Sequence, residues 1–126
     1  MMRIGDFTCL LPLLLGVPGV GAAESDEAAL TRLRVEIHQL VGSARCRNLV
    51  HCRLLALGVS PCGGPSEYVA YSSGFTDIPA LETKASEFAF IQGEMLDRQD
   101  PPKQCVSAIE PQAQCIDHHC RVVPGK

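Results

Sequence analysis

Cysteines are the residues of this chain best suited to covalent chemistry. Cys9 lies inside an apolar N-terminal run, and six more cysteines follow it. The six are Cys46, Cys52, Cys62, Cys105, Cys115 and Cys120. An even number of cysteines in about 100 residues is typical of a disulfide framework formed in an oxidising compartment. Pairing of near neighbours predicts the bonds Cys46–Cys52, Cys115–Cys120 and Cys62–Cys105. The last of these would close the longest loop and contribute about 4 kcal/mol.

A zinc site is an alternative for the last two cysteines. The segment Cys115-Ile-Asp-His-His-Cys120 contains thiols and imidazoles, which are ligands that zinc prefers. Adjacent histidines, here His118 and His119, point to opposite sides of a strand, and no second paired set of ligands occurs at the usual spacing. In an oxidising compartment the thiols pair with each other instead. We therefore expect neither a metal nor another cofactor.

The stretch Cys62-Gly-Gly-Pro-Ser-Glu-Tyr-Val-Ala-Tyr-Ser72 combines a constrained turn with both tyrosines of the chain. Gly63 and Gly64 accept backbone angles closed to other residues, and the proline after them fixes the next one. Consecutive free N–H groups in such a turn can hold an anion or a peptide carbonyl. Tyr68 and Tyr71 point to opposite faces of a strand, so at most one lies beside the turn. The pattern fits a structural turn and also a binding surface made of Gly63, Gly64, Tyr68 and Tyr71.

Motifs of catalysis are not found in the sequence. The serines lie outside any nucleophile-elbow pattern, no C-x-x-C occurs, and the carboxylates between residues 82 and 97 fit the solvated face of a helix. Charges of both signs are interspersed along the chain, with a formal net charge of −3. This composition indicates neither nucleic acid nor an anionic membrane as a partner. We therefore expect that the protein is not an enzyme.

Residues 1–22 are predicted to be a secretory signal peptide. Arg3 precedes the apolar run Phe7–Val20, and small residues lead from that run to Ala23. The run is interrupted by proline and glycine and falls short of the ~18–20 apolar residues that a spanning helix needs. A retained anchor is the alternative. Residues 23–126 are predicted to form one disulfide-stapled domain, periplasmic or secreted, with no membrane span after cleavage.

Two amphipathic helices are predicted in this domain. Residues 25–42 place apolar side chains at helical spacing, with Ser25 as the N-cap and Gly42 as the end. Residues 76–99 repeat the pattern, with Thr76 as the predicted cap.

Short apolar runs predict four strands, at residues 52–57, 68–71, 105–109 and 119–123, the last two joined through Pro111. This order of elements predicts the α+β class, with two helices packed on a short antiparallel sheet. The core of such a domain is small, and disulfides compensate for it.

The chain from Leu33 to Val122 resembles a group of small exported cysteine-rich bacterial proteins. The most specific part of the resemblance is Pro61–Ser72, with its Pro-Cys-Gly-Gly-Pro turn and two tyrosines. The resemblance implies a proteobacterial cell-envelope protein, and it brings no activity, ligand or catalytic residue. Residues 47–51 are more basic and apolar than is typical of the group.

These patterns lead to one hypothesis and two alternatives. We expect an exported binding module that resembles a small inhibitor, with an envelope protein or an exogenous hydrolase as partner. One alternative is a structural envelope protein without a discrete site. The other is a small metal-dependent or hydrolytic enzyme that uses His118 and His119.

Overall fold

The structure is a computed structural model that describes residues 12–13, 15–16 and 23–126. Most of the predicted signal segment, residues 1–22, lies outside the described residues, so its cleavage stays a prediction. Among the residues that are described, no helix is both long and apolar enough to cross a membrane.

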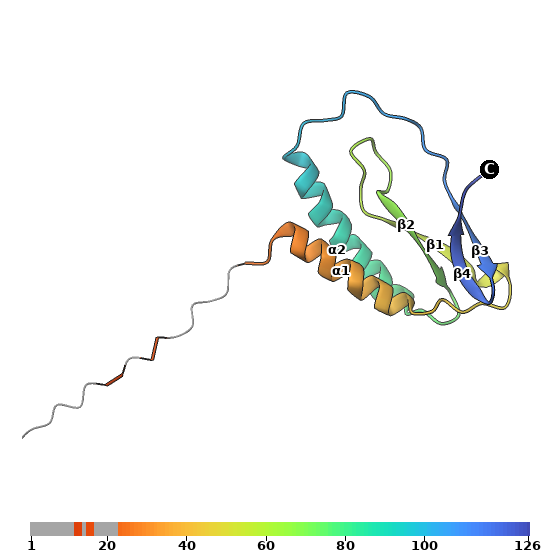
Figure 1. The fold of residues 1–126 in the computed structure, drawn as a ribbon, viewed down its shortest axis with the longest axis horizontal. Helices are drawn as coiled ribbons and strands as arrows, with labels where there is room; N and C mark the ends of the chain where they lie inside the picture. The colour runs from red at the N-terminus through yellow and green to blue at the C-terminus, as the bar shows by residue number, and fades with distance from the viewer. Residues whose placement is uncertain (1–11, 14, 17–22) are drawn as a thin grey trace, which may run out of the picture.

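The elements form three layers, which follow one another from left to right in Figure 1. The helices make the first layer, one β-hairpin the middle layer and a second hairpin the third. In chain order the elements are α1 (Asp26–Val41), a short 3-10 helix η1 (Leu49–His51), β1 (Cys52–Leu57), β2 (Glu67–Ser72), α2 (Ile78–Asp97), β3 (Gln112–Ile116) and β4 (His119–Val123). The predicted α+β class is confirmed.

Helix α1 begins and ends where the sequence predicts. The Ser25 hydroxyl accepts a hydrogen bond from the Ala28 N–H at 3.1 Å, which satisfies one of the free donors of the first turn. At the other end Gly42 takes a φ of +57°, and its N–H donates to the His38 carbonyl. A residue with a side chain is disfavoured at that angle, so the glycine ends the helix.

Helix α2 begins one residue later than predicted from Thr76 as the cap. The Asp77 carboxylate accepts from the Ala80 N–H at 3.1 Å, so Asp77 is the N-cap and the prediction of Thr76 was wrong. This position puts Pro79 in the first turn, where its missing N–H costs no hydrogen bond. The Thr76 hydroxyl is buried and has no hydrogen-bond partner among the described residues.

The core lies between the helices and the first hairpin. Its most deeply buried side chains are Leu33, Ile37, Leu57, Leu81 and Phe88, all at most 1% exposed. Arg34 of α1 covers this core, because its guanidinium lies 5.2 Å from the centre of the Phe88 ring and 3.0 Å from a Glu67 oxygen. One side chain thus connects α1, α2 and β2 through a cation–π contact and an ion pair.

Ion pairs join the outer surfaces of the two helices. Glu36 lies 3.3 Å from Arg32 and 3.0 Å from Lys84, and Glu24 accepts from Arg32. Hydrogen bonds from Lys84 lower the pKa of Glu36, and those from Arg32 lower the pKa of Glu24. A lowered folded-state pKa stabilises the fold above the unfolded pKa, and this stabilisation is lost as the pH falls through the lowered value. These groups are exposed, so the contribution is small.

The strands form two hairpins and not one continuous sheet. In β1–β2 the pairing runs from Cys52 opposite Ser72 to Leu57 opposite Glu67. In the second hairpin Asp117 and His118 form a two-residue turn with φ values of +51° and +64°. Positive φ at both central positions is the geometry of a type I′ turn, which matches the twist of paired strands.

The predicted strand at residues 105–109 was wrong, although those at 52–57, 68–71 and 119–123 are confirmed. The partner of β4 is instead Gln112–Ile116, joined to it by the two-residue turn and not through Pro111. Cys105 is bonded to Cys62 in the loop between β1 and β2, which keeps residues 105–109 away from β4.

Gly58 closes the end of β1 against helix α2. Its φ is +75°, and an added Cβ would overlap the Gln92 Oε1 and Ser66 Oγ atoms. Gln92 Oε1 accepts from the Val59 N–H at 2.7 Å and lies 2.9 Å from Ser66 Oγ. The glycine therefore makes room for the side chain that connects α2 to the loop after β1.

Two glycine substitutions test this interpretation. We expect Gly63→Ala to lower the free energy of unfolding by about 1–2 kcal/mol, because φ is +89° and nothing lies within 4 Å of the added methyl group. Gly58→Ala adds overpacking to the same backbone strain and should cost about 1–3 kcal/mol more. Urea unfolding with the disulfides intact measures both. Equal losses for the two variants would contradict the role given to Gly58.

Candidate binding surface

Three disulfides are formed, and two of the predicted pairings were wrong. The bonds are Cys46–Cys115, Cys52–Cys120 and Cys62–Cys105. The last pair is confirmed, whereas the predicted near-neighbour bonds Cys46–Cys52 and Cys115–Cys120 are replaced by crossed ones. The bonds span 69, 68 and 43 residues in that order, so Cys62–Cys105 closes the shortest of the three loops.

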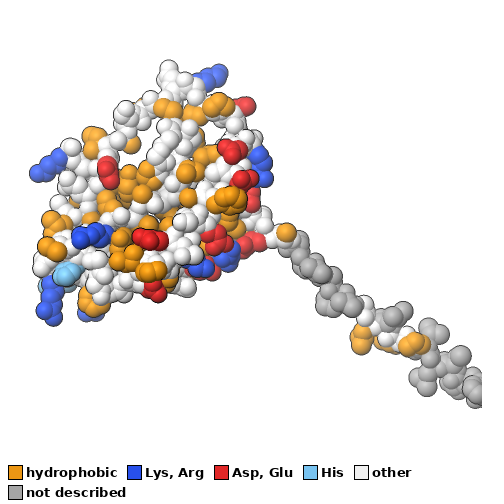
Figure 2. Space-filling model, turned by 180° about the vertical axis from the view of Figure 1, so that it is seen from behind, with side chains coloured by type: hydrophobic (Ala, Val, Ile, Leu, Met, Phe, Trp, Pro, Cys, Tyr) orange, Lys and Arg blue, Asp and Glu red, His pale blue; other side chains and the backbone are white. Residues whose placement is uncertain are grey.

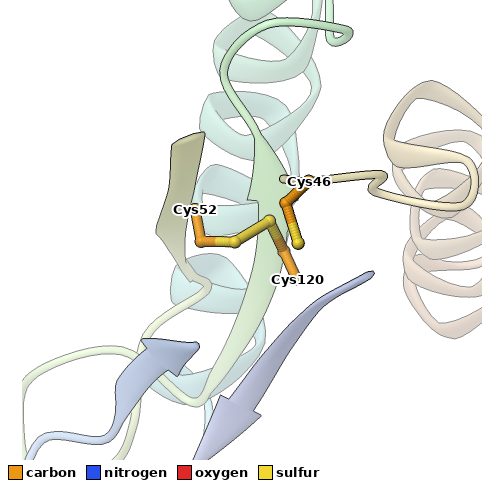
Figure 3. A group of neighbouring side chains, drawn as sticks. All are labelled: Cys46, Cys52 and Cys120. Atoms are coloured by element: carbon orange, nitrogen blue, oxygen red, sulfur yellow. A yellow bond between two sulfur atoms is a disulfide. The ribbon is translucent and has the colours of Figure 1, made fainter. Parts of the chain in front are cut away.

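Backbone pairing explains why the near neighbours do not bond. The Cys46 N–H donates to the His118 carbonyl at 2.9 Å, and the Cys120 N–H donates to the Ala44 carbonyl at 2.8 Å. These bonds hold residues 44–46 beside the tip of the second hairpin. Figure 3 shows Cys46 beside the Cys52–Cys120 bond, and the sulfur atoms of all three cysteines lie within 4.8 Å of one another. Spatial proximity therefore overrides spacing in the sequence.

Three residues of the alternative zinc site, Cys115, His119 and Cys120, have other partners. Cys115 and Cys120 are bonded to cysteines from the first half of the chain. His119 Nδ1 lies 2.7 Å from the Ser43 carbonyl, whereas the His118 side chain is exposed at the turn. In this arrangement neither cysteine of the segment offers a thiolate to a metal.

Three of the four candidate surface residues lie together. Gly63, Gly64 and Tyr68 line a hollow of about 380 Å³, which also contacts Val106 and Ile109. Tyr71 does not join them. The alternation of β2 directs its side chain to the other face of the hairpin, where it packs against the core.

The glycine turn is not a free anion cradle. The Gly63 N–H donates to the Ser60 carbonyl at 3.0 Å, and the Ser60 N–H donates to the Gly64 carbonyl at 2.8 Å. Internal hydrogen bonds therefore use donors that the sequence analysis left available to a ligand. This tight turn requires positive φ values, +89° at Gly63 and +72° at Gly64, which glycine adopts without strain.

The segment from Asp100 to Glu110 is the largest surface feature that sequence reasoning missed. It arches from the end of α2 to the start of β3 in Figure 1, without regular secondary structure, and every one of its residues is exposed. Its backbone N–H groups donate to no atom in the described part of the chain. Val106 is 91% exposed and Ile109 is 70% exposed. Prolines at 101, 102 and 111 are the sequence signal that could have identified it.

We call this arrangement the stapled face: residues 100–110, the Cys62–Cys105 bond, Gly63, Gly64 and Tyr68. The bond ties the middle of the exposed segment to the glycine turn, and β3 holds its C-terminal end.

Comparisons with protein-family models, curated proteins and solved structures found no match for this chain. Function is therefore inferred from the geometry of the chain itself.

Removing one disulfide at a time tests what each bond holds. We expect Cys62→Ser with Cys105→Ser to leave the far-UV spectrum unchanged, because both residues are exposed and lie outside the core. Proteolysis between residues 99 and 111 should become about tenfold faster or more, because the segment is no longer tied at its middle. Limited proteolysis followed by mass spectrometry measures this rate.

The matched control is Cys52→Ser with Cys120→Ser. Both of these residues are buried, and their loss should lower the free energy of unfolding by about 2–5 kcal/mol. We conclude that the Cys62–Cys105 bond restrains only the exposed segment. This conclusion would be wrong if the control variant kept its stability, or if the Cys62→Ser, Cys105→Ser variant lost its helices.

Proposed function

We propose that this chain is an exported inhibitor that presents residues 104–110 to the substrate cleft of an extracellular or envelope endopeptidase. Three disulfides support an oxidising compartment, which agrees with the signal peptide predicted for residues 1–22. The partner is thus a protein met outside the cytoplasm.

The exposed, stapled segment is the observation that carries this proposal. Between Asp100 and Glu110 the backbone N–H groups make no hydrogen bond within the described residues, so they are free for a partner. An extended peptide binds by adding its backbone to the edge of a partner's sheet, and pockets for its side chains give specificity. Endopeptidases bind substrates through such backbone pairing.

The Cys62–Cys105 bond restrains the segment, whereas a flexible peptide substrate is unrestrained. Cys105 fixes one point of it to the glycine turn, and Gln112 begins β3 only two residues after Glu110. Because ordering an unrestrained loop costs free energy on association, a segment held at both ends binds more tightly than the same residues in a free peptide. The restraint also slows separation of the two ends after a peptide bond is cut.

The side chains of the segment indicate the class of enzyme. Val106, Ser107, Ala108 and Ile109 are small or aliphatic and uncharged. A small apolar primary pocket, as in elastase-type serine endopeptidases, accepts such residues, whereas a trypsin-type pocket requires a positive charge. The hollow lined by Gly63, Gly64 and Tyr68 lies behind the segment and offers a second area of contact.

Titration against a panel of serine endopeptidases tests the proposal. We expect the oxidised mature chain to inhibit an elastase-type enzyme at least about tenfold more tightly than a trypsin-type enzyme, because Val106 to Ile109 contains no basic side chain. Val106→Asp with Ala108→Asp should abolish inhibition, since an apolar pocket excludes a carboxylate. Hydrolysis of a chromogenic peptide substrate gives the inhibition constants.

Two controls accompany this titration. Phe90→Asp changes an exposed apolar residue on α2, outside the stapled face, and should inhibit as the parent chain does. The Cys62→Ser, Cys105→Ser variant should be cleaved as an ordinary substrate. Inhibition that is unchanged by the aspartate substitutions, or rapid turnover of the parent chain by every enzyme of the panel, would rule out this function.

A further inference from the structure

A second surface lies at the opposite end of the hairpins from the stapled face. There the loop before β1, the loop after β2 and the β3–β4 turn come together. The Cys46 N–H donates to the His118 carbonyl, and the Ser73 N–H donates to the His51 carbonyl at 2.8 Å. Arg45, Arg47, Phe75 and His118 share one hollow of about 610 Å³.

We call this surface the arginine face. It consists of basic side chains around exposed apolar ones: Arg45, Arg47, His51, Arg53 and His118 with Leu49, Val50 and Phe75. Figure 2 shows basic, histidine and hydrophobic side chains gathered at the lower left edge of the molecule, whereas most acidic side chains lie toward the right. The interspersed charges of the sequence are thus separated in the folded chain.

The positive charge of the arginine face is largely uncompensated. No acidic residue occurs between Ile37 and Ser66, and Asp117, the only one after Glu110, is the one carboxylate that lines the hollow. The ion pairs of the described residues use Arg32, Arg34, Lys84 and Arg98, and none of them uses an arginine of this face. Asp77, the nearest acidic residue after Phe75, caps helix α2.

Apolar side chains project among these cations. Leu49, Val50 and Phe75 are 58%, 68% and 77% exposed. Arg53 donates to the Val50 carbonyl at 2.8 Å, which places its guanidinium at the backbone of the short helix that carries Leu49 and Val50. A protein that only needs to attract a soluble anion gains nothing from projecting apolar groups, whereas binding at a lipid interface combines cations for the headgroups with apolar side chains for the acyl boundary.

The arginine face is also rigid. Cys46 lies between Arg45 and Arg47 in the chain and is bonded to Cys115, while the adjacent bond Cys52–Cys120 fixes the end of η1. Both disulfides restrain the backbone of the face, so this backbone needs little ordering on binding.

We propose that the arginine face binds the surface of an anionic phospholipid bilayer, with the guanidinium groups on the phosphates and Leu49, Val50 and Phe75 at the acyl boundary. This peripheral contact is independent of the proposed inhibitor function, because it uses the opposite end of the hairpins. Each arginine near an anionic surface raises the partition coefficient about fivefold. A buried phenylalanine side chain adds about tenfold or more.

Vesicle flotation of the oxidised mature chain tests this proposal. With vesicles of phosphatidylcholine and phosphatidylglycerol at 7:3, we expect binding at low ionic strength that falls steeply in 0.5 M NaCl, because salt screens exposed charges. Vesicles of phosphatidylcholine alone should bind far less. Arg45→Gln, Arg47→Gln and Arg53→Gln combined should lower the partition coefficient by about 100-fold, the product of three fivefold losses. Val50→Ser with Phe75→Ser should lower it about tenfold or more.

Matched variants separate this face from overall charge and hydrophobicity. Arg98→Gln, Lys103→Gln and Lys126→Gln remove equally many positive charges elsewhere, and Phe90→Ser with Val106→Ser removes exposed apolar side chains elsewhere. Both should bind vesicles as the parent chain does. Equal binding to the two vesicle types would overturn the proposal. A second result would also overturn it: soluble polyglutamate that displaces the parent chain from vesicles and binds the Val50→Ser, Phe75→Ser variant with the same affinity. The partner would then be a soluble acidic polymer.

Discussion

The covalent attachment of the second hairpin to the first is the constraint on which the rest of the structure depends. An isolated two-stranded hairpin is marginally stable in water, and β3–β4 buries little apart from Cys120. The bonds Cys46–Cys115 and Cys52–Cys120 supply the stabilisation that the small apolar contact of this hairpin does not. They also set where the exposed segment ends and where the loops of the arginine face meet. Both candidate surfaces are therefore consequences of the same pair of crosslinks.

Charge is divided between the layers of the fold. The helices carry most of the carboxylates, and Asp26, Glu36 and Glu87 pair with Arg32, Lys84 and Arg98. The basic side chains of this layer are therefore neutralised locally. The loops of the arginine face carry arginines that form no ion pair among the described residues. The formal net charge of −3 averages over these two regions and conceals both. An interaction with an anionic surface is compatible with this net charge because attraction is local and is screened within about 10 Å.

Local signals predicted the local features of this fold. Ser25 and Gly42 bound α1 because capping and glycine conformation depend on a few neighbouring residues, and the apolar run of β1 was found for a similar reason. The prediction of Thr76 as the N-cap was wrong because the adjacent Asp77 is also a favourable capping residue and takes that position. At the helix ends the determining contacts lie within four positions in the sequence.

Features that depend on tertiary pairing could not be predicted in this way. The crossed disulfides follow from hydrogen bonds between residues 44–46 and the hairpin tip, about 70 positions away, as the separation of 69 between Cys46 and Cys115 shows. The strand β3 was missed because its turn contains Asp117 and His118 at positive φ and lacks the usual glycine. Of the candidate surface residues, Gly63, Gly64 and Tyr68 lie together as predicted. The exposed segment beside them was missed because the apolar residues 105–109 were interpreted as a strand, despite the prolines at 101, 102 and 111.

The two long-range crosslinks also determine what happens when the exposed segment is cut. Hydrolysis of a peptide bond between residues 106 and 110 would divide the polypeptide into two chains. The C-terminal chain would nevertheless remain attached through Cys115 and Cys120 to Cys46 and Cys52. The product would be a nicked molecule heavier by one water, with its new ends held near each other and its arginine loops undisturbed. Such a molecule loses no fragment by diffusion, so the same bond can be closed again by the enzyme that opened it.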